Sequence, residues 1–327
     1  EMQTALRSCR LATRRVLKQA HRRCGVHRVL ATTTSNSLVL ANAHCVRRGL
    51  STEHNHGHHH QHNHGHEDDI NVSTDVAKQA IVDTVKKYAY DSFLVGLWLP
   101  AETRSIFYAM HAFNIELAMA QTLARDNALA AQIRLQFWRD VVDAVYASPP
   151  KPVDRVPMGQ ALQFAAQSAS VSKRWFDRVL DTREADILRE DRTWKTLDEA
   201  ETFCEGVYSS LLYATSDSVS GGCAYTETAL SRIGTAHGLM NMLLGIPAAI
   251  AQGGYLGLPM SLFEKPLDPR SNSADRDDVI SVVHSVCVEI DEHLQQARSL
   301  LPQVPKENRC LLLQVRSHNF VFMVKCL

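Results

Sequence analysis

The segment 104–122 constrains the fold of this chain more than any other. It reads RSIFYAMHAFNIELAMAQT, and its apolar residues lie on nearly every side of a helix instead of along one stripe. A helix that is apolar all round has to be buried, because none of its faces is suited to water. Other helices must therefore surround this segment, and we expect it to be the central helix of an all-α fold.

Helical spacing continues along most of the chain. From residue 73 onward apolar residues recur three and four positions apart, and no stretch shows sustained strand alternation with hairpin turns. Thr196-Leu197-Asp198-Glu199 predicts a capped helix start, while Pro149-Pro150 and Gly221-Gly222 predict helix ends. We expect one all-α domain over residues 73–327. Its helices are marked by Ala77, Ile81, Val85 and Tyr88; by Leu129, Ile133, Phe137, Val141 and Val145; by Trp175, Phe176, Val179, Leu180, Ile187 and Leu188; and by the segments 196–218, 227–251 and 279–300.

The first 51 residues differ in composition from the rest. Of the 35 basic and 35 acidic residues, ten basic residues and only one acid lie in this segment. An Arg-rich, Ser/Thr-rich and acid-poor start is typical of an organelle transit peptide, and Arg48-Gly49-Leu50-Ser51 resembles a mitochondrial processing site. We expect residues 1–51 to be a transit peptide for the mitochondrial matrix. A chloroplast address and a basic arm without a targeting role are the alternatives.

The rest of the chain then carries nine more acids than bases. This balance disfavours nucleic-acid binding, which depends on excess positive charge. Five cysteines lie beyond residue 51 without C-x-x-C spacing, so we expect buried thiols in a reducing compartment and no disulfide framework. The longest apolar run, Leu243–Ala251, is far shorter than the roughly 20 residues of a membrane-spanning helix. Any membrane contact is therefore expected to be peripheral.

Residues 52–72 contain a histidine-rich tract, HNHGHHHQHNHGH at 54–66. We interpret this segment as a low-complexity linker between the transit peptide and the domain. Metal binding is the alternative, since imidazole is a ligand for zinc, nickel and copper, although no Cys or carboxylate is spaced to close a tetrahedral site. The histidines of that alternative are His54, His56, His58, His60, His62, His64 and His66.

Several short sequences follow one another in an order known from one protein family. They are Leu99-Pro100 with Arg104, Phe107-Tyr108-Ala109, Ala112-Phe113-Asn114, Gln136-Phe137-Trp138-Arg139, Arg183-Glu184 and Tyr208-Ser209-Ser210-Leu211-Leu212-Tyr213. No single piece is specific, but their order and spacing make residues 80–300 resemble the squalene/phytoene synthase family. The likeness is greatest to its non-catalytic mitochondrial branch, which acts in the assembly of respiratory complex I. The resemblance implies an all-α isoprenoid-synthase fold with helices around a deep apolar cavity.

The resemblance also implies a test for catalysis. Active members of the family join two prenyl diphosphates, and two D-x-x-x-D motifs on facing helices hold magnesium beside the departing pyrophosphate. Alignment without gaps places Ala118 and Thr122 at the first motif, Gly245 and Ala249 at the second, and Leu244 where an Arg usually stands. All four carboxylates are absent, so we expect a pseudoenzyme without a cofactor. Pro247 is also expected to kink the second helix.

Other charged residues have structural interpretations. Asp177 and Asp181 are formally D-x-x-x-D, but neighbouring bases predict a solvated face with ion pairs, and Asp140 and Asp143 are expected at the surface as well. Glu116 stands on an otherwise apolar helix, where a buried carboxylate is costly unless it is paired. The candidate partners of that carboxylate are Arg134, Arg139 and His111.

Side chains of the two facing helices are the candidates to line a cavity, if the domain keeps one. The aromatic residues among them are explained equally well as ordinary core. Glu102 and Arg104 are expected to be helix-start charges, and a contact of Arg104 with an anion is the alternative. The candidate lining residues are Arg104, Phe107, Tyr108, Phe113, Asn114, Glu116 and Asn241.

The expected function is therefore binding. By resemblance, the chain would help assemble complex I at the matrix face of the inner membrane, and would offer a surface or an apolar pocket to its partners. The partners implied are complex I subunits, other assembly factors, and a lipid or isoprenoid. A prenyl diphosphate transferase with unorthodox metal ligands and an isoprenoid or lipid carrier are the alternatives.

Overall fold

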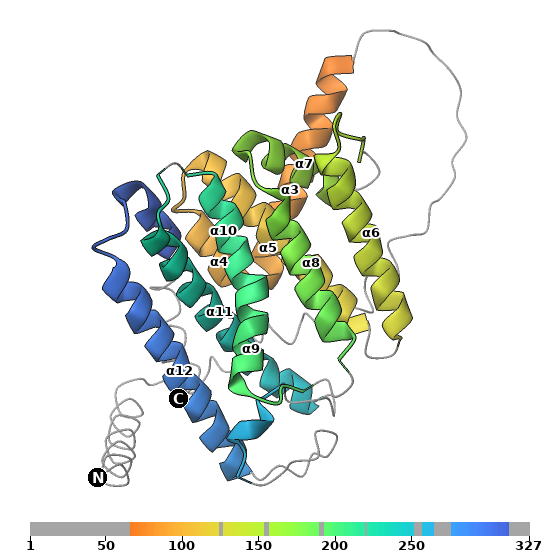
Figure 1. The fold of residues 1–327 in the computed structure, drawn as a ribbon. Helices are drawn as coiled ribbons and strands as arrows, with labels where there is room; N and C mark the ends of the chain where they lie inside the picture. The colour runs from red at the N-terminus through yellow and green to blue at the C-terminus, as the bar shows by residue number, and fades with distance from the viewer. Residues whose placement is uncertain are drawn as a thin grey trace, which may run out of the picture.

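The computed structural model describes residues 66–313, apart from 124–126, 154–156, 190–192, 220, 252–256 and 265–275. Within these residues all regular structure is helical, as predicted (Figure 1). The predicted transit peptide, the histidines before His66 and the tail beyond residue 313 lie outside the described residues. No helix in the described part of the chain has the length and hydropathy needed to cross a bilayer.

Ten α-helices lie within the described residues. The α-helices are α3 His66–Tyr88, α4 Tyr90–Gly96, α5 Ala101–Leu123, α6 Ala128–Tyr146, α7 Pro157–Ala169, α8 Lys173–Ile187, α9 Leu197–Cys204, α10 Ser210–Asp217, α11 Ala224–Ala251 and α12 Arg276–Leu300. A π-helical turn, η3 (Glu205–Ser209), joins α9 to α10 without a break. Two 3₁₀ turns, η4 (Met260–Leu262) and η5 (Lys306–Leu313), follow α11 and α12.

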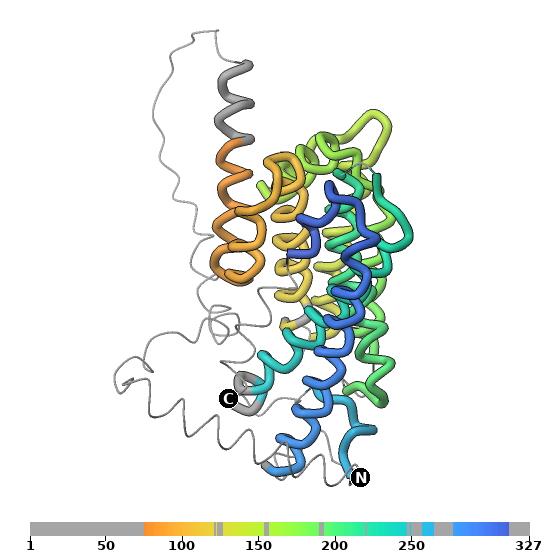
Figure 2. The backbone as a smooth tube through the Cα atoms, turned by 90° about the vertical axis from the view of Figure 1, so that its left-hand side faces the viewer, coloured from red at the N-terminus to blue at the C-terminus, as the bar shows by residue number. Residues whose placement is uncertain are grey.

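The predicted central helix is confirmed. α5 packs against α3, α4, α6, α7, α8 and α10, and Ile106, Met110 and Phe113 on successive turns are completely buried. In Figure 2, α3 lies at one side of the bundle and α12 toward the other. α11 packs against α12, α9 and η3, so the second predicted wall helix is enclosed as well.

Two helix starts differ from the boundaries predicted from the sequence. α3 begins at His66, inside the segment 52–72 that composition assigned to a linker, and α12 begins at Arg276, inside the predicted loop 264–278. α4 and α7 are helices that were not predicted from the sequence. α11 continues as an α-helix through Pro247 to Ala251.

α6 exposes three of the five residues of its predicted apolar row, Leu129, Ile133 and Phe137. Leu129 and Ile133 are 65% and 63% exposed, whereas the buried face contains Leu135, Trp138 and Val142. The cause is the helical period: a step of four residues advances the side chain by about 40° beyond a full turn. A row of five residues, four such steps long, therefore winds around the helix, and its first residues face away from the core.

Candidate functional site

α11 approaches the π-helical turn η3 very closely. A Cβ atom on Gly234 would overlap the backbone of Ser209, and one on Gly238 would lie 2.5 Å from Cβ of Cys204 and 2.7 Å from the ring of Tyr208. Because no side chain fits at these two positions, only glycine lets α11 and η3 meet here. The close approach brings polar side chains of the two elements together.

The π-helical turn carries two polar side chains with different surroundings. Tyr208 takes part in a buried hydrogen-bonded chain, whereas Glu205 lines a pocket. An inserted residue in a π turn changes the direction in which side chains leave the helix, and such turns are frequent at functional sites. Desolvation raises the pKa of Tyr208 above its usual range, so its hydroxyl stays protonated at neutral pH.

The buried polar chain crosses the bundle between α5 and α11. Arg183 on α8 is 3% exposed, and its guanidinium donates to Oδ1 of Asn114 on α5 at 3.1 and 2.5 Å. The guanidinium also bonds the hydroxyl of Tyr208, which is in turn hydrogen-bonded to Asn241 on α11. Four helical segments are thus tied together around one buried cation. We call Asn114, Arg183, Tyr208 and Asn241 the central polar chain.

Aromatic rings pack beside the central polar chain. The ring centroids of Phe107 and His111, both on α5, lie 4.4 Å apart. His111 and His237 of α11 are 6.0 Å apart, and His237 and Tyr208 are 5.2 Å apart. This row of rings connects α5 to α11 and occupies part of the space between the two helices.

The four positions that the alignment assigns to the acidic motifs offer little to a metal ion. On α5 the Thr122 hydroxyl donates to the carbonyl oxygen of Ala118 at 3.1 Å. On α11 Gly245 is exposed, and apart from its own helix no atom of the described residues lies within 4 Å of a Cβ position there; Ala249 is 6% exposed. Magnesium needs several hard oxygen ligands, and the one hydroxyl here is bonded to its own helix.

Arg104 holds the end of α4 in place. Its guanidinium donates to the carbonyl oxygens of Gly96, Leu97 and Leu99 at 2.9, 3.2 and 2.9 Å. Cationic donors near a helix C-terminus satisfy the carbonyl groups that have no partner within the helix. The donors of Arg104 are therefore engaged with backbone, which favours the structural interpretation over an anion contact.

The predicted aromatic residues belong to the core. Phe107, Tyr108 and Phe113 are 2%, 4% and 0% exposed. The Tyr108 hydroxyl donates to the carbonyl oxygen of Phe93 at 2.8 Å, and Phe113 contacts the ring of Phe176 edge-on, with centroids 5.4 Å apart. These residues fill the interior as a helical core does.

Several charged residues of α5, α6 and α8 form ion pairs, whereas Arg183 of α8 is buried and not part of the predicted solvated face. Glu116 forms an ion pair with Arg134 at 3.5 Å, one of the three expected partners. Lys173 pairs with Asp177 at 2.9 Å and with Asp143 at 3.0 Å. The remaining contacts on this face join Arg139 to Asp181 and Glu184, and Gln136 to Asp140.

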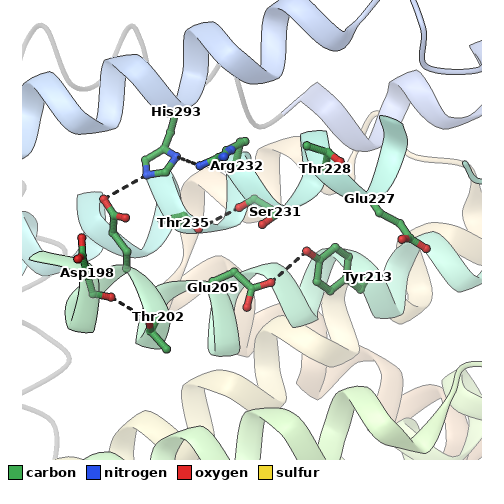
Figure 3. A pocket seen from close by; sticks show the side chains of 11 residues that line it. Asp198, Thr202, Glu205, Tyr213, Glu227, Thr228, Ser231, Arg232, Thr235 and His293 are labelled. Atoms are coloured by element: carbon green, nitrogen blue, oxygen red, sulfur yellow. Dashed lines mark hydrogen bonds and ion pairs between the residues drawn. The ribbon is translucent and has the colours of Figure 1, made fainter. Parts of the chain in front are cut away.

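A polar pocket that the sequence analysis missed opens between α9, η3, α10, α11 and α12. Its volume is about 580 Å³ (Figure 3). No motif marked it, because its residues come from three segments that are far apart in the sequence. They are Asp198, Glu201, Thr202, Glu205, Tyr213, Glu227, Thr228, Ser231, Arg232, Thr235 and His293.

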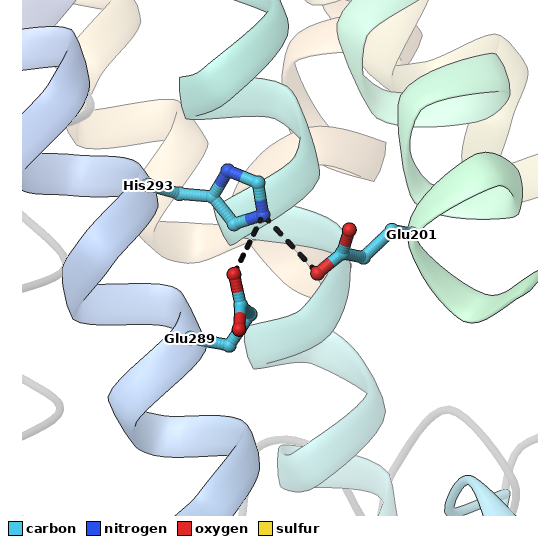
Figure 4. Close-up of side chains that lie close together, drawn as sticks. All are labelled: Glu201, Glu289 and His293. Atoms are coloured by element: carbon cyan, nitrogen blue, oxygen red, sulfur yellow. Dashed lines mark hydrogen bonds and ion pairs between the residues drawn. The ribbon is translucent and has the colours of Figure 1, made fainter. Parts of the chain in front are cut away.

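Three metal-ligating side chains meet at this pocket (Figure 4). His293 of α12 is 3% exposed, and its Nε2 lies 3.3 Å from Oε1 of Glu201 and 3.8 Å from Oε1 of Glu289. One ligand atom from each residue lies within 4.8 Å of the other two. Burial and the charge of Glu201 raise the pKa of Glu289 above its usual range. We call Glu201, Glu289 and His293 the His–Glu cluster.

Known proteins resemble this chain in sequence over most of the domain. The sequence pattern of the squalene/phytoene synthase family matches residues 85–318. The Bos taurus protein named NADH dehydrogenase (ubiquinone) complex I, assembly factor 6 is 30% identical over 228 residues, which is 68% of this chain and 66% of that protein. The assembly factor 6 of Rattus norvegicus is 29% identical, over 72% of this chain and 70% of its own length. A Drosophila melanogaster homologue is 27% identical, over 70% of this chain and 69% of its own.

Solved structures share the fold at low sequence identity. A squalene synthase, HpnC from Alicyclobacillus acidocaldarius, superposes with a TM-score of 0.61 at 16% identity, over 79% of this chain and 94% of its own. A dehydrosqualene synthase superposes with a TM-score of 0.60 at 17% identity, over 78% and 89% of the two chains. The predicted all-α synthase fold is thereby confirmed, and with the sequence match over residues 85–318 the chain belongs to the squalene/phytoene synthase family.

Proposed function

We propose that this chain is a non-catalytic member of its family and acts in the assembly of mitochondrial complex I. The relatives from cattle, rat and fruit fly carry names that assign them to complex I assembly. The observation that carries the non-catalytic part is the central polar chain. It holds the buried cation of Arg183 against Asn114, one turn before Ala118 on α5, and links that cation through Tyr208 to Asn241, one turn before Gly245 on α11.

A buried guanidinium works against a magnesium site in the same space. Two like charges in a weakly screened interior repel each other, so Arg183 opposes an incoming dication. Its donors are bonded to Asn114 and Tyr208, so the polar atoms of these two residues are engaged within the protein. The buried polar residues thus hold the helices together. We infer that the protein acts by binding partners at its surface.

An apolar surface at α4 is suited to partner binding at a membrane. Tyr90, Leu94, Leu97 and Trp98 lie along one face of α4 and the turn after it, and are 52%, 40%, 49% and 79% exposed. Trp and Tyr favour the interface between lipid and water, and nearby lysines favour anionic headgroups. Lys86 and Lys87 lie just before this surface and are exposed. We propose that the α4 surface rests on the matrix face of the inner membrane.

Gene deletion tests the assembly function. Cells without the gene are expected to lose assembled complex I and its NADH:ubiquinone activity, while complexes III and IV stay at normal levels. Re-expression of the full-length chain should restore complex I, and re-expression without residues 1–51 should not, because that segment is the proposed matrix address. Normal complex I in the deleted cells would refute the proposed function.

The purified protein tests the non-catalytic part separately. Incubated with farnesyl or geranylgeranyl diphosphate and Mg²⁺, it is expected to release no pyrophosphate, with an active squalene synthase as positive control. Turnover under these conditions would favour the transferase alternative. Native mass spectrometry addresses the carrier alternative, which predicts a bound lipid that survives purification.

A further inference from the structure

We propose that the His–Glu cluster is a binding site for a divalent transition-metal ion of the Zn²⁺ class. One imidazole nitrogen and two carboxylate oxygens converge on a single point at the wall of the polar pocket, as Figure 4 shows. Imidazole suits zinc and its neighbours in the transition series, and carboxylates complete many such sites. The donor set therefore favours Zn²⁺ over Mg²⁺, for which nitrogen is a poor ligand.

The distances in the cluster fit a metal ion of this size. In a tetrahedral zinc site with bonds of about 2.0–2.1 Å, ligand atoms lie roughly 3.3–3.4 Å apart. Nε2 of His293 lies 3.3 Å from Glu201 and 3.8 Å from Glu289, and all three ligand atoms lie within 4.8 Å of one another. Small rotations of the two glutamates, whose side chains are 25% and 32% exposed, would complete the geometry.

The elements that carry the ligands are held in place by their packing. Glu289 and His293 are one turn apart on α12, and Glu201 comes from α9. α11 packs against both of these helices, so the ligands are presented by rigid elements and not by a loop. The open pocket beside the cluster gives access to the ion and leaves room for a water ligand at the fourth position.

Arg232 adjusts the affinity of this site. Its Nη1 lies 3.4 Å from Nδ1 of His293. A guanidinium can only donate, so Nδ1 accepts and the imidazole proton resides on Nε2, facing the two carboxylates. When a metal ion takes the place of that proton, Nδ1 becomes the protonated nitrogen and the contact with Arg232 is lost. Arg232 therefore favours the tautomer of His293 that cannot bind a metal ion through Nε2. A hydrogen-bond acceptor in its place would favour the tautomer that can.

The site is separate from the motif positions of the family. α11 rises by about 1.5 Å per residue, so Gly245 lies about 20 Å along the helix axis from Arg232. A metal ion in the His–Glu cluster would join α9 to α12 and stabilise the domain, because it binds only the folded chain.

Zinc titration of the full-length protein tests the proposal. The eight histidines of residues 54–66 are replaced by asparagine in every sample, so that the tract contributes no binding. Calorimetry is expected to show one Zn²⁺ per chain and a higher melting temperature on binding, with no response to Mg²⁺.

In Glu289→Gln and His293→Ala the affinity for Zn²⁺ should fall by at least about 10–100-fold. Glu227→Gln, which changes an exposed carboxylate of the same pocket, should bind as the unmodified site does.

Two further observations make the test decisive. Arg232→Gln should bind Zn²⁺ more tightly, because glutamine accepts the Nδ1 proton where arginine repels it. Glu289→Gln is nearly isosteric, and unchanged circular dichroism would show that it folds, so its loss of binding cannot reflect unfolding. The proposal is overturned if no zinc binds, if Glu289→Gln and His293→Ala bind as well as the parent, or if Glu227→Gln is as damaging as they are.

Discussion

Arg183 and Asn114 meet inside the bundle, where the α8 guanidinium donates two hydrogen bonds to one α5 amide oxygen. Arg183 is 3% and Asn114 7% exposed, so water cannot replace either partner. A buried donor left without its acceptor costs the full desolvation of that group. The pair therefore fixes how α8 sits on α5, and it links both helices to Tyr208 and α11.

This relationship predicts strong energetic coupling between the two positions. Asn114→Ala should lower the free energy of unfolding by about 2–3 kcal/mol, because it leaves guanidinium N–H groups buried without an acceptor. The double variant Asn114→Leu, Arg183→Met should cost less than the sum of the two single changes, by about 0.5–3 kcal/mol. Urea denaturation measures the parent, the single variants Asn114→Ala, Asn114→Leu and Arg183→Met, and the double variant. Asp140→Asn, an exposed change, serves as control, and strict additivity would contradict the coupling.

Two glycines of α11 are predicted to respond in opposite directions. Gly234→Ala should destabilise by about 1–3 kcal/mol or more, since the new methyl group would overlap the backbone of Ser209. Gly245→Ala should stabilise by about 0.5–1 kcal/mol, because the position is exposed, helical and surrounded by open space. The midpoints of urea unfolding compare the two variants directly. An unchanged or raised midpoint in Gly234→Ala would contradict the close contact of α11 with η3, and a lowered midpoint in Gly245→Ala would contradict the open surroundings of that position.

The rate at which each cysteine is alkylated should depend on the pKa of its thiol. Hydrogen bonding to Thr226 lowers the pKa of Cys223, whereas burial raises the pKa of Cys204 and of Cys310. A lower thiol pKa gives a larger thiolate fraction at pH 7.5, and the thiolate is the species that reacts. Iodoacetamide labelling followed by site-resolved mass spectrometry should therefore modify Cys223 well before Cys204 and Cys310. Thr226→Val should slow Cys223, and equal rates at the three sites would contradict this order.

The α4 surface should govern binding to membranes. Leu97→Ser and Trp98→Ser together should weaken association with vesicles that contain anionic lipid by roughly tenfold or more, because each large apolar side chain contributes about 1.5–3 kcal/mol when fully buried. Leu188→Ser, at a 56% exposed position beyond the end of α8, is the matched control. Vesicle sedimentation measures both variants. An equal loss in the control, or no loss in the α4 variant, would leave the proposed membrane surface without support.

Local signals in the sequence located several features correctly. The predicted helix start at Thr196 is confirmed: the Glu199 amide donates to the Thr196 hydroxyl at 3.2 Å, while the Glu199 carboxylate accepts from the Lys195 amide instead of that of Thr196. Glu116 has one of its predicted partners, Arg134. Both predictions depend on short-range rules: a capping residue acts within one turn, and a carboxylate on an apolar helix requires a nearby base. Such rules can be applied without knowing how the helices are arranged.

The sequence by itself determined that segment 104–122 is the central helix, because a helix without a polar face can be stable only when others surround it. Only the tertiary structure decided which polar residues meet. In the sequence, nothing distinguishes Arg183 from the other charged residues of its segment. Only the packing of the helices shows that it is buried against Asn114. Glu201 and His293 are 92 positions apart and share no motif. Their contact exists because α9 and α12 both pack on α11, and helix packing is set by the summed fit of many side chains, which no local pattern records.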